Sequence, residues 1–146
     1  MLKAKAHKDI EWAFIFDPDL DADWARNYFQ EYNNTWPNLR PDLPRPVATP
    51  GKELVTLTLR SLTKGQMVRV ESIPDGYQKL ATICAYGVVS WRGLFDEHGR
   101  PIEAKSTQDD LGAKLTAESL EDLCFFGFTD LSLLQIAAHR VLVITR

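Results

Sequence analysis

The stretch ELVTLTLR at residues 53–60 carries the clearest secondary-structure signal in the chain, because apolar and polar residues alternate along it. Successive side chains of an extended strand point to opposite faces. One face therefore carries Val55, Leu57 and Leu59, whereas the other face carries two threonines. This period of two predicts a strand with one buried face, against which the other elements must pack.

Helical signals follow this strand. Thr63 is a candidate N-cap for a short helix, which Gly65 weakens. Pro74, Asp75 and Gly76 together predict a turn. The next segment, YQKLATICAYGVV at residues 77–89, repeats apolar residues every three to four positions and predicts a central, mostly buried helix.

The segment SWRGLFDEHGRPIE at residues 90–103 predicts a hairpin. In that hairpin residues 91–95 pair with residues 100–103 around a turn at residues 97–99. Residues 104–114 are polar, and we expect them to form a loop.

Two helices are expected in the C-terminal part. The first is AESLEDLCFFG, with Thr116 as its N-cap and a stop at Gly127. The second is DLSLLQIAAHRVLVITR, with Thr129 or Asp130 as its N-cap. Apolar residues cover more than one face of this last helix, so it is either buried within the domain or docked on a partner.

The first fifty residues predict a strand at residues 11–16, a short helix and a proline-rich strap. Asp21 or Asp23 can cap the helix, which carries Trp24 and Tyr28 on one face. Residues 36–50 hold five of the eight prolines and predict an extended strap.

Together these elements predict an α+β fold, with short strands and a hairpin packed with about four helices and a helical C-terminal part. Residues 1–50 and the main α+β domain at residues 51–146 are expected to form one compact domain.

The charge of the chain disfavours a nucleic-acid partner. The 146 residues carry a formal net charge of −3, whereas a phosphate-backbone binder needs a basic surface. The first residues, MLKAKAHKDIEW, lack the apolar core of a signal peptide, and no stretch approaches the roughly 20 apolar residues of a membrane span. We therefore expect a cytoplasmic protein that binds neither nucleic acid nor a membrane.

Residues that carry catalysis or bind metals occur without a recognisable motif. His7, His98 and His139 lack the spacing of metal ligands, and a zinc site that combined the last two with Cys84 and Cys124 would have arbitrary spacing. The two cysteines have apolar neighbours and predict buried thiols in a reducing compartment. The chain also lacks G-x-S-x-G and a glycine-rich phosphate loop, so we expect no enzyme activity, metal or cofactor.

Acidic residues gather in the second half of the chain. Residues 96–122 contain eight acidic and three basic residues, a net charge of −5. This run is either a solvated surface or an acidic face for a basic partner.

The segment CFFGF at residues 124–128 places three phenylalanines in four positions. One small helix cannot bury all three against a single neighbour, so either one anchors an interface or all three fill the core under the last helix. Trp91 is a further candidate, although its apolar neighbours favour burial beneath the hairpin. The candidate protein-binding residues are Phe125, Phe126, Phe128, Leu131, Leu134 and Trp91.

Three segments carry a resemblance to a known family: TLTLRSLTKGQ, YQKLATICAYGVV and VVSWRGLFDEHGRPIE. In the last of these, small apolar residues precede Trp91, Gly93, an acidic turn, Gly99 and an apolar residue after proline. From Glu53 to its end the chain resembles tail assembly chaperones of tailed phages and similar small tail-morphogenesis proteins. Residues 1–50 lie outside this pattern.

The resemblance implies a non-enzymatic binding role. Such chaperones are thought to coat the long helical tape-measure protein before the tail tube polymerises around it. The resemblance therefore implies a helical tape-measure or tail protein as the partner and the host cytoplasm as the location. The alternatives are a connector or tail-completion subunit of the virion, a homo-oligomer, and a small enzyme or inhibitor.

Overall fold

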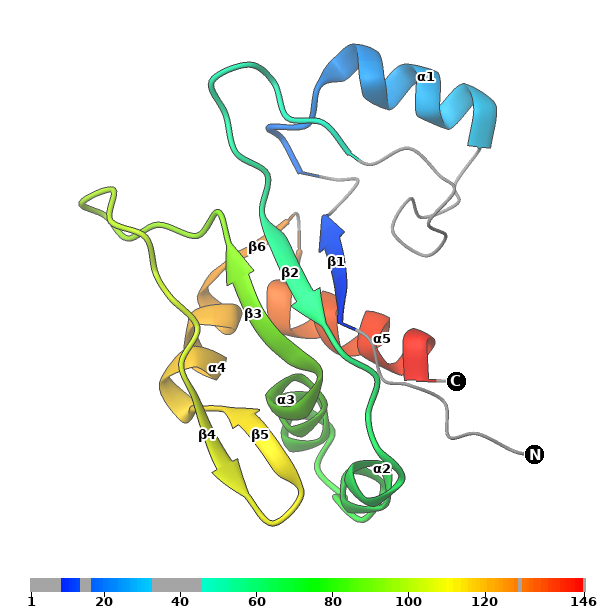
Figure 1. The fold of residues 1–146 in the computed structure, drawn as a ribbon, viewed down its shortest axis with the longest axis vertical. Helices are drawn as coiled ribbons and strands as arrows, with labels where there is room; N and C mark the ends of the chain where they lie inside the picture. The colour runs from blue at the N-terminus through cyan, green and yellow to red at the C-terminus, as the bar shows by residue number, and fades with distance from the viewer. Residues whose placement is uncertain (1–8, 14–16, 33–45, 129, 146) are drawn as a thin grey trace.

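The predicted strand at residues 53–60 forms the centre of a three-stranded antiparallel sheet. The computed structural model describes residues 9–13, 17–32, 46–128 and 130–145. Strand β2 spans Thr56–Leu59 and lies between β1 at Ile10–Ala13 and β3 at Val88–Arg92 (Figure 1). The N-terminal strand therefore belongs to the same sheet as β2 and β3.

The face of β2 that carries Leu57 and Leu59 is buried, and its other face is covered in part. Leu57 lies opposite Trp12 on one side and Trp91 on the other, and its side chain is fully buried, as is that of Leu59. Thr56, on the opposite face, is buried as well. The predicted buried face is therefore confirmed, whereas on the other face Thr58 is only half-buried.

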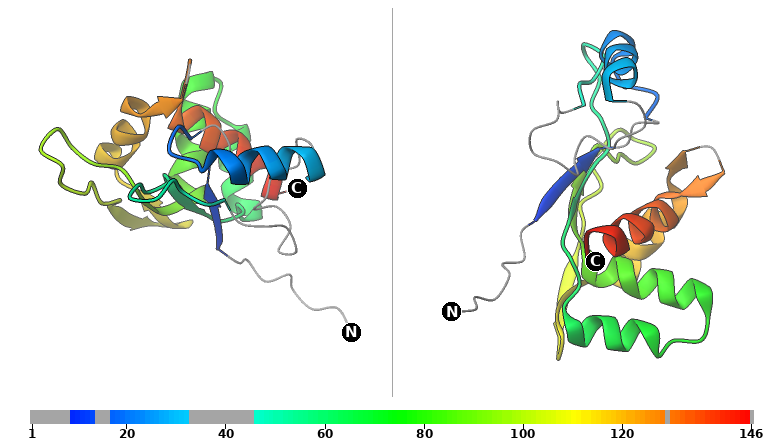
Figure 2. Two further views of the ribbon diagram at one scale, coloured as in Figure 1. Left: turned by 90° about the horizontal axis from the view of Figure 1, so that it is seen from above. Right: turned by 90° about the vertical axis from the view of Figure 1, so that its right-hand side faces the viewer.

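The helices of the main body pack on one side of this sheet. The described residues contain five helices: α1 at Ala22–Tyr32, α2 at Lys64–Glu71, α3 at Gly76–Gly87, α4 at Ala117–Phe125 and α5 at Leu133–Thr145. Figure 2 shows α2, α3 and α5 on the same side of the sheet. The core lies between α5, α3 and the sheet.

Local capping begins three of these helices as the sequence predicts. Thr63 accepts a hydrogen bond from the backbone N–H of Gln66, whose side chain bonds back to Thr63, which makes a complete capping box. Asp21 accepts the backbone N–H of Trp24 at 2.8 Å, which starts α1. Thr116 accepts the backbone N–H of Ser119 and starts α4.

Helix α1 lies beyond the end of the sheet (Figure 1). The rings of Trp24 and Tyr28 stack in α1 with their centroids 4.9 Å apart. Leu20 pairs with Ala48, so residues 46–50 of the predicted strap run beside the turn before α1. The rest of the strap, and residues 14–16 of the predicted first strand, lie outside the described residues.

The hairpin predicted at residues 90–103 is confirmed only in part. Its two arms meet around the predicted turn at the bridge between Phe95 and Pro101, and the backbone N–H of Ile102 donates to the carbonyl of Leu94 at 2.9 Å. They do not form the predicted regular ladder, because β3 pairs with β2. The polar residues 104–114 are not a loop, because β4 at Ser106–Asp109 and β5 at Gly112–Leu115 form an antiparallel hairpin. The helix predicted at residues 77–89 ends at Gly87, and β3 begins at the next residue, Val88.

The last helix begins later than predicted. A two-stranded hairpin, β6 at Gly127–Phe128 and β7 at Leu131–Ser132, precedes α5. Ser132 and Gln135 exchange hydrogen bonds between side chain and backbone, so Ser132 caps α5. Asp130 lies before this cap, and Thr129 lies outside the described residues.

The structure confirms the α+β class with a helical C-terminal part. It also resolves the apolar character of α5: the helix is buried within the domain, with Leu134, Ala137, Ala138 and Val141 almost inaccessible. None of the described helices is both long enough and apolar enough to cross a membrane.

Candidate functional site

Phe125 and Phe126, at the end of α4, differ in their exposure to solvent. Phe125, the last residue of the helix, is 85% exposed. Phe126 is half-buried and packs against the main core. Phe128 belongs to β6, but its side chain is outside what the structure describes. The alternative in which all three phenylalanines fill the core is wrong, because Phe125 does not enter it.

Two other exposed apolar side chains belong to elements that contact α4. Tyr77, in the first turn of α3, is 55% exposed, and its hydroxyl shares a 3.2 Å hydrogen bond with the thiol of Cys124. Leu131, in β7 against the end of α4, is 49% exposed. Tyr77 was not among the predicted residues, because its place beside α4 depends on a contact across 47 positions of sequence.

The outer face of α4 adds acidic groups to these apolar ones. Glu118, Glu121 and Phe125 are all exposed, and their spacing places them on one helix face. We call the region formed by Tyr77, Glu118, Glu121, Phe125 and Leu131 the α4 surface.

Negative charge predominates on α4 and in the residues that follow it. Residues 117–132 contain four acidic residues and no lysine, arginine or histidine. Burial raises the pKa of Asp122, and the neighbouring carboxylates of Glu118 and Glu121 raise it further. The Lys105 ammonium reaches Glu118 at 3.3 Å from the neighbouring segment and offsets only part of this charge.

Two predicted residues lie in the core instead. Leu134 is 1% exposed, and its carbonyl accepts a hydrogen bond from the buried thiol of Cys84. Trp91 is buried, and its indole N–H donates to the carbonyl of Ile102 at 2.8 Å. Neither side chain offers surface to a partner, whereas Phe125 and Leu131 do.

A groove of about 560 Å³ lies next to α4 and is a second candidate site. Ala81 and Ala85 of α3 and Leu120 of α4 contribute apolar walls, and Tyr86 and Lys114 stand among the polar residues that line it. Small side chains in α3 leave this space open.

A polar cluster at this groove fixes the β4–β5 hairpin. The Asp109 carboxylate accepts hydrogen bonds from the hydroxyl of Tyr86 and the backbone N–H of Leu111, and it lies 3.3 Å from both Arg69 and Lys114. Arg69 also bonds the adjacent carboxylate of Asp110. The adjacent carboxylates of Asp109 and Asp110 therefore join the hairpin to α2 and α3.

The protonation states of this cluster suit a static role. The hydrogen bond from Tyr86 lowers the pKa of Asp109, so the carboxylate stays ionised near neutral pH. Burial, followed by the bond to Asp109, raises the pKa of Tyr86, so the phenol stays protonated. A general base or acid near neutral pH needs a pKa close to that pH, and both groups are moved away from it.

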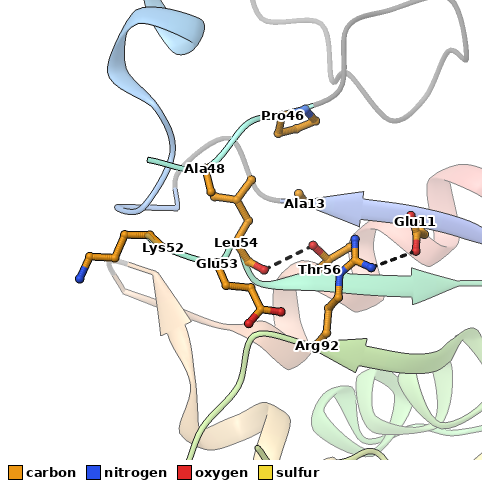
Figure 3. Close-up of a pocket in the computed structure, with 9 residues that line it drawn as sticks. All are labelled: Glu11, Ala13, Pro46, Ala48, Lys52, Glu53, Leu54, Thr56 and Arg92. Atoms are coloured by element: carbon orange, nitrogen blue, oxygen red, sulfur yellow. Dashed lines mark hydrogen bonds and ion pairs between the residues drawn. The ribbon is translucent and has the colours of Figure 1, made fainter. Parts of the chain in front are cut away.

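A third candidate is a cavity of about 470 Å³ between the sheet and residues 46–54 (Figure 3). Its polar lining has both signs: Arg92 lies 3.6 Å from Glu11, and Lys52 and Glu53 stand at the rim. Figure 3 shows these side chains around the apolar Leu54. The mixed charges select neither an anion nor a cation.

The thiols and imidazoles are dispersed in the described part of the chain. Burial raises the pKa of Cys84 strongly, whereas Cys124 is half-buried. His98 lies in the exposed turn beside Glu97, and His139 is exposed on α5. Among the described residues no group of three or more histidine, cysteine, aspartate or glutamate side chains is arranged to hold a metal ion, and His7 lies outside them.

Comparison of the chain with protein-family models, with curated proteins and with solved structures finds no match.

Proposed function

We propose that this chain is a non-enzymatic protein-binding protein of phage tail morphogenesis, which acts like a chaperone for the tape-measure protein and binds it through the α4 surface. The observation that carries the proposal is Phe125, an aromatic side chain that is 85% exposed at the end of a helix. Its action would precede tube assembly, in the cytoplasm of the host.

The α4 surface carries exposed apolar and aromatic side chains of the kind that anchor protein interfaces. Isolated exposed apolar residues are normal on any protein, but here three of them come from α4 and from two elements that contact it, α3 and β7. Aromatic side chains bury a large area at a small cost in rotamer entropy, so they dominate binding energy at protein interfaces. Full burial of one phenylalanine under a partner contributes roughly 1.5–3 kcal/mol.

The residues that carry the resemblance have a different part in this proposal. Trp91 is buried, and Gly93 has a φ of 88°, where an added Cβ would lie 2.6 Å from the carbonyl oxygen of Leu54. These residues pack β3 and the segment after it against β2 and Leu54, so they serve the fold and not the α4 surface. A tape-measure protein exposes apolar stripes on its helices, and Phe125, Tyr77 and Leu131 offer an apolar surface to cover such a stripe.

The test is capture of the tape-measure protein by tagged chain in cells that express the tail proteins encoded beside its gene. We expect Phe125→Ser to abolish capture. Val68→Ser is the matched control, because Val68 is an apolar residue, 61% exposed, on α2 and outside the α4 surface. Capture should survive this control change.

Two results would contradict the proposal. Equal capture by the wild-type and Phe125→Ser proteins would show that the α4 surface is not the binding site. Detection of the chain in purified mature particles would instead favour a structural virion component, such as a connector or tail-completion subunit.

A further inference from the structure

We infer that the segment that covers the α4 surface is a basic amphipathic helix, whose apolar residues cover Phe125 and whose lysines or arginines face Glu118 and Glu121. This inference rests on the proposed function and goes further, because it fixes the charge of the partner and the order of its residues along α4.

The order follows from the geometry of α4. Glu118 and Phe125 are seven positions apart on one face, which is about 10 Å along a helix that rises 1.5 Å per residue. The apolar part of the surface is concentrated at the Phe125 end, where Tyr77 meets Cys124 and β7 contacts α4. A helix lying along α4 therefore needs its apolar residues at that end and its cations one to two turns away.

The sign of the charge follows from an excess of carboxylates on α4 that Lys105 offsets only in part. No basic residue occurs in residues 117–132. Within the described residues, the Lys105 ammonium forms an ion pair with only one carboxylate of α4, that of Glu118. Glu121 also raises the pKa of Tyr77, after the larger effect of the Cys124 hydrogen bond. A cationic partner would relieve the repulsion among these carboxylates, and it would be drawn to the site by their field.

The same charges disfavour other occupants. A second copy that used this surface would bring a second set of carboxylates, Glu118 and Glu121, into the contact, and like charges in a contact oppose association. An acidic helix would meet the same repulsion. The inference therefore commits to a basic partner and not to a second copy of the chain.

The experiment uses two synthetic peptides of about 18 residues, long enough to form several helical turns. Both carry the same leucine stripe at positions i, i+3, i+4 and i+7. One has lysines beside the stripe, and the other has glutamates at the same positions. Each peptide is titrated into the uniformly ¹⁵N-labelled full chain while amide shifts are followed by NMR.

We expect the lysine peptide to shift the amides of α4, Tyr77 and Leu131, and the glutamate peptide to shift none of them. Replacement of both carboxylates, Glu118→Gln with Glu121→Gln, should weaken binding of the lysine peptide about fivefold at low ionic strength. The matched control is Glu31→Gln with Glu97→Gln, which removes the same charge from exposed positions in α1 and in the turn after β3. This control should change affinity by less than about twofold, because those charges lie outside the contact.

The inference is overturned if both peptides bind equally, if neither binds, or if the two pairs of substitutions weaken binding equally. It also falls if the shifts map away from α4. In each of these cases Phe125-dependent capture of the tape-measure protein would leave the proposed function intact. Capture that does not depend on Phe125 would remove the proposed function, and the inference with it.

Discussion

Replacement of Phe125 by serine separates a binding role from a folding role. Only about a seventh of this residue is removed from water on folding, since it is 85% exposed. Full burial of a phenylalanine is worth roughly 1.5–3 kcal/mol, so the part that Phe125 contributes to the free energy of unfolding is about 0.2–0.5 kcal/mol. Leu134, which is 1% exposed, provides the contrast: its truncation to alanine should cost about 2–5 kcal/mol.

The assay is urea unfolding followed by circular dichroism, with thermal unfolding as a second measure. Phe125→Ser should move the melting temperature by no more than about 2 °C, whereas Leu134→Ala should lower it by roughly 10 °C. The affinity for the partner should fall by a factor of about 30 or more for Phe125→Ser, as for other aromatic anchors. A loss of more than about 2 kcal/mol in unfolding free energy for Phe125→Ser would mean that the side chain is packed, and it would refute our assignment of the α4 surface.

Three further predictions concern the framework. Gly87→Ala should destabilise the chain by about 2 kcal/mol, because the added Cβ would lie 2.4 Å from a methyl carbon of Val141; a urea double-mutant cycle should show that Val141→Ala restores part of this loss, and additive losses would contradict the clash. The pKa of Asp109 is lowered in the folded chain, so its contribution to the free energy of unfolding is present above its ordinary pKa and is lost as pH falls through the lowered value. Between about pH 5 and pH 2 the melting temperature should therefore fall less steeply for Asp109→Asn than for the wild type. Parallel curves would contradict this. Thr63→Ala removes half of the α2 capping box and should cost about 1 kcal/mol in urea unfolding, with no loss expected if the cap were dispensable.

The signals that the sequence revealed correctly are local ones. Thr63, Asp21 and Thr116 each accept a backbone N–H three residues later, so the residues that define the helix start stand next to one another in the chain. The alternation around Leu57 is local as well. These contacts do not depend on the rest of the fold, and the sequence was sufficient to place them.

The features that the sequence missed depend on distant contacts. The polar β4–β5 hairpin has no apolar alternation to identify it, and Asp109 bonds Arg69 and Tyr86 across 40 and 23 positions. The exposure of Tyr77 beside Cys124 has the same origin. The start of α5 differs from the prediction for another reason: Ser132 and Gln135 form a local cap only two to three residues after the predicted caps, Thr129 or Asp130.

The end of α4 explains why a phenylalanine at position 125 is free to serve binding. The helix stops because Phe126 is extended, with φ −99° and ψ 148°, and its side chain turns towards the core. Gly127 is required next, since a Cβ there would lie 2.3 Å from the carbonyl oxygen of Leu131 in the paired strand. These two residues fix where the chain leaves α4, whereas the side chain of Phe125 points into solvent and takes no part in that turn. A polar residue would satisfy the fold at position 125 equally well, so the aromatic ring there is the feature that the proposed contact with a partner explains.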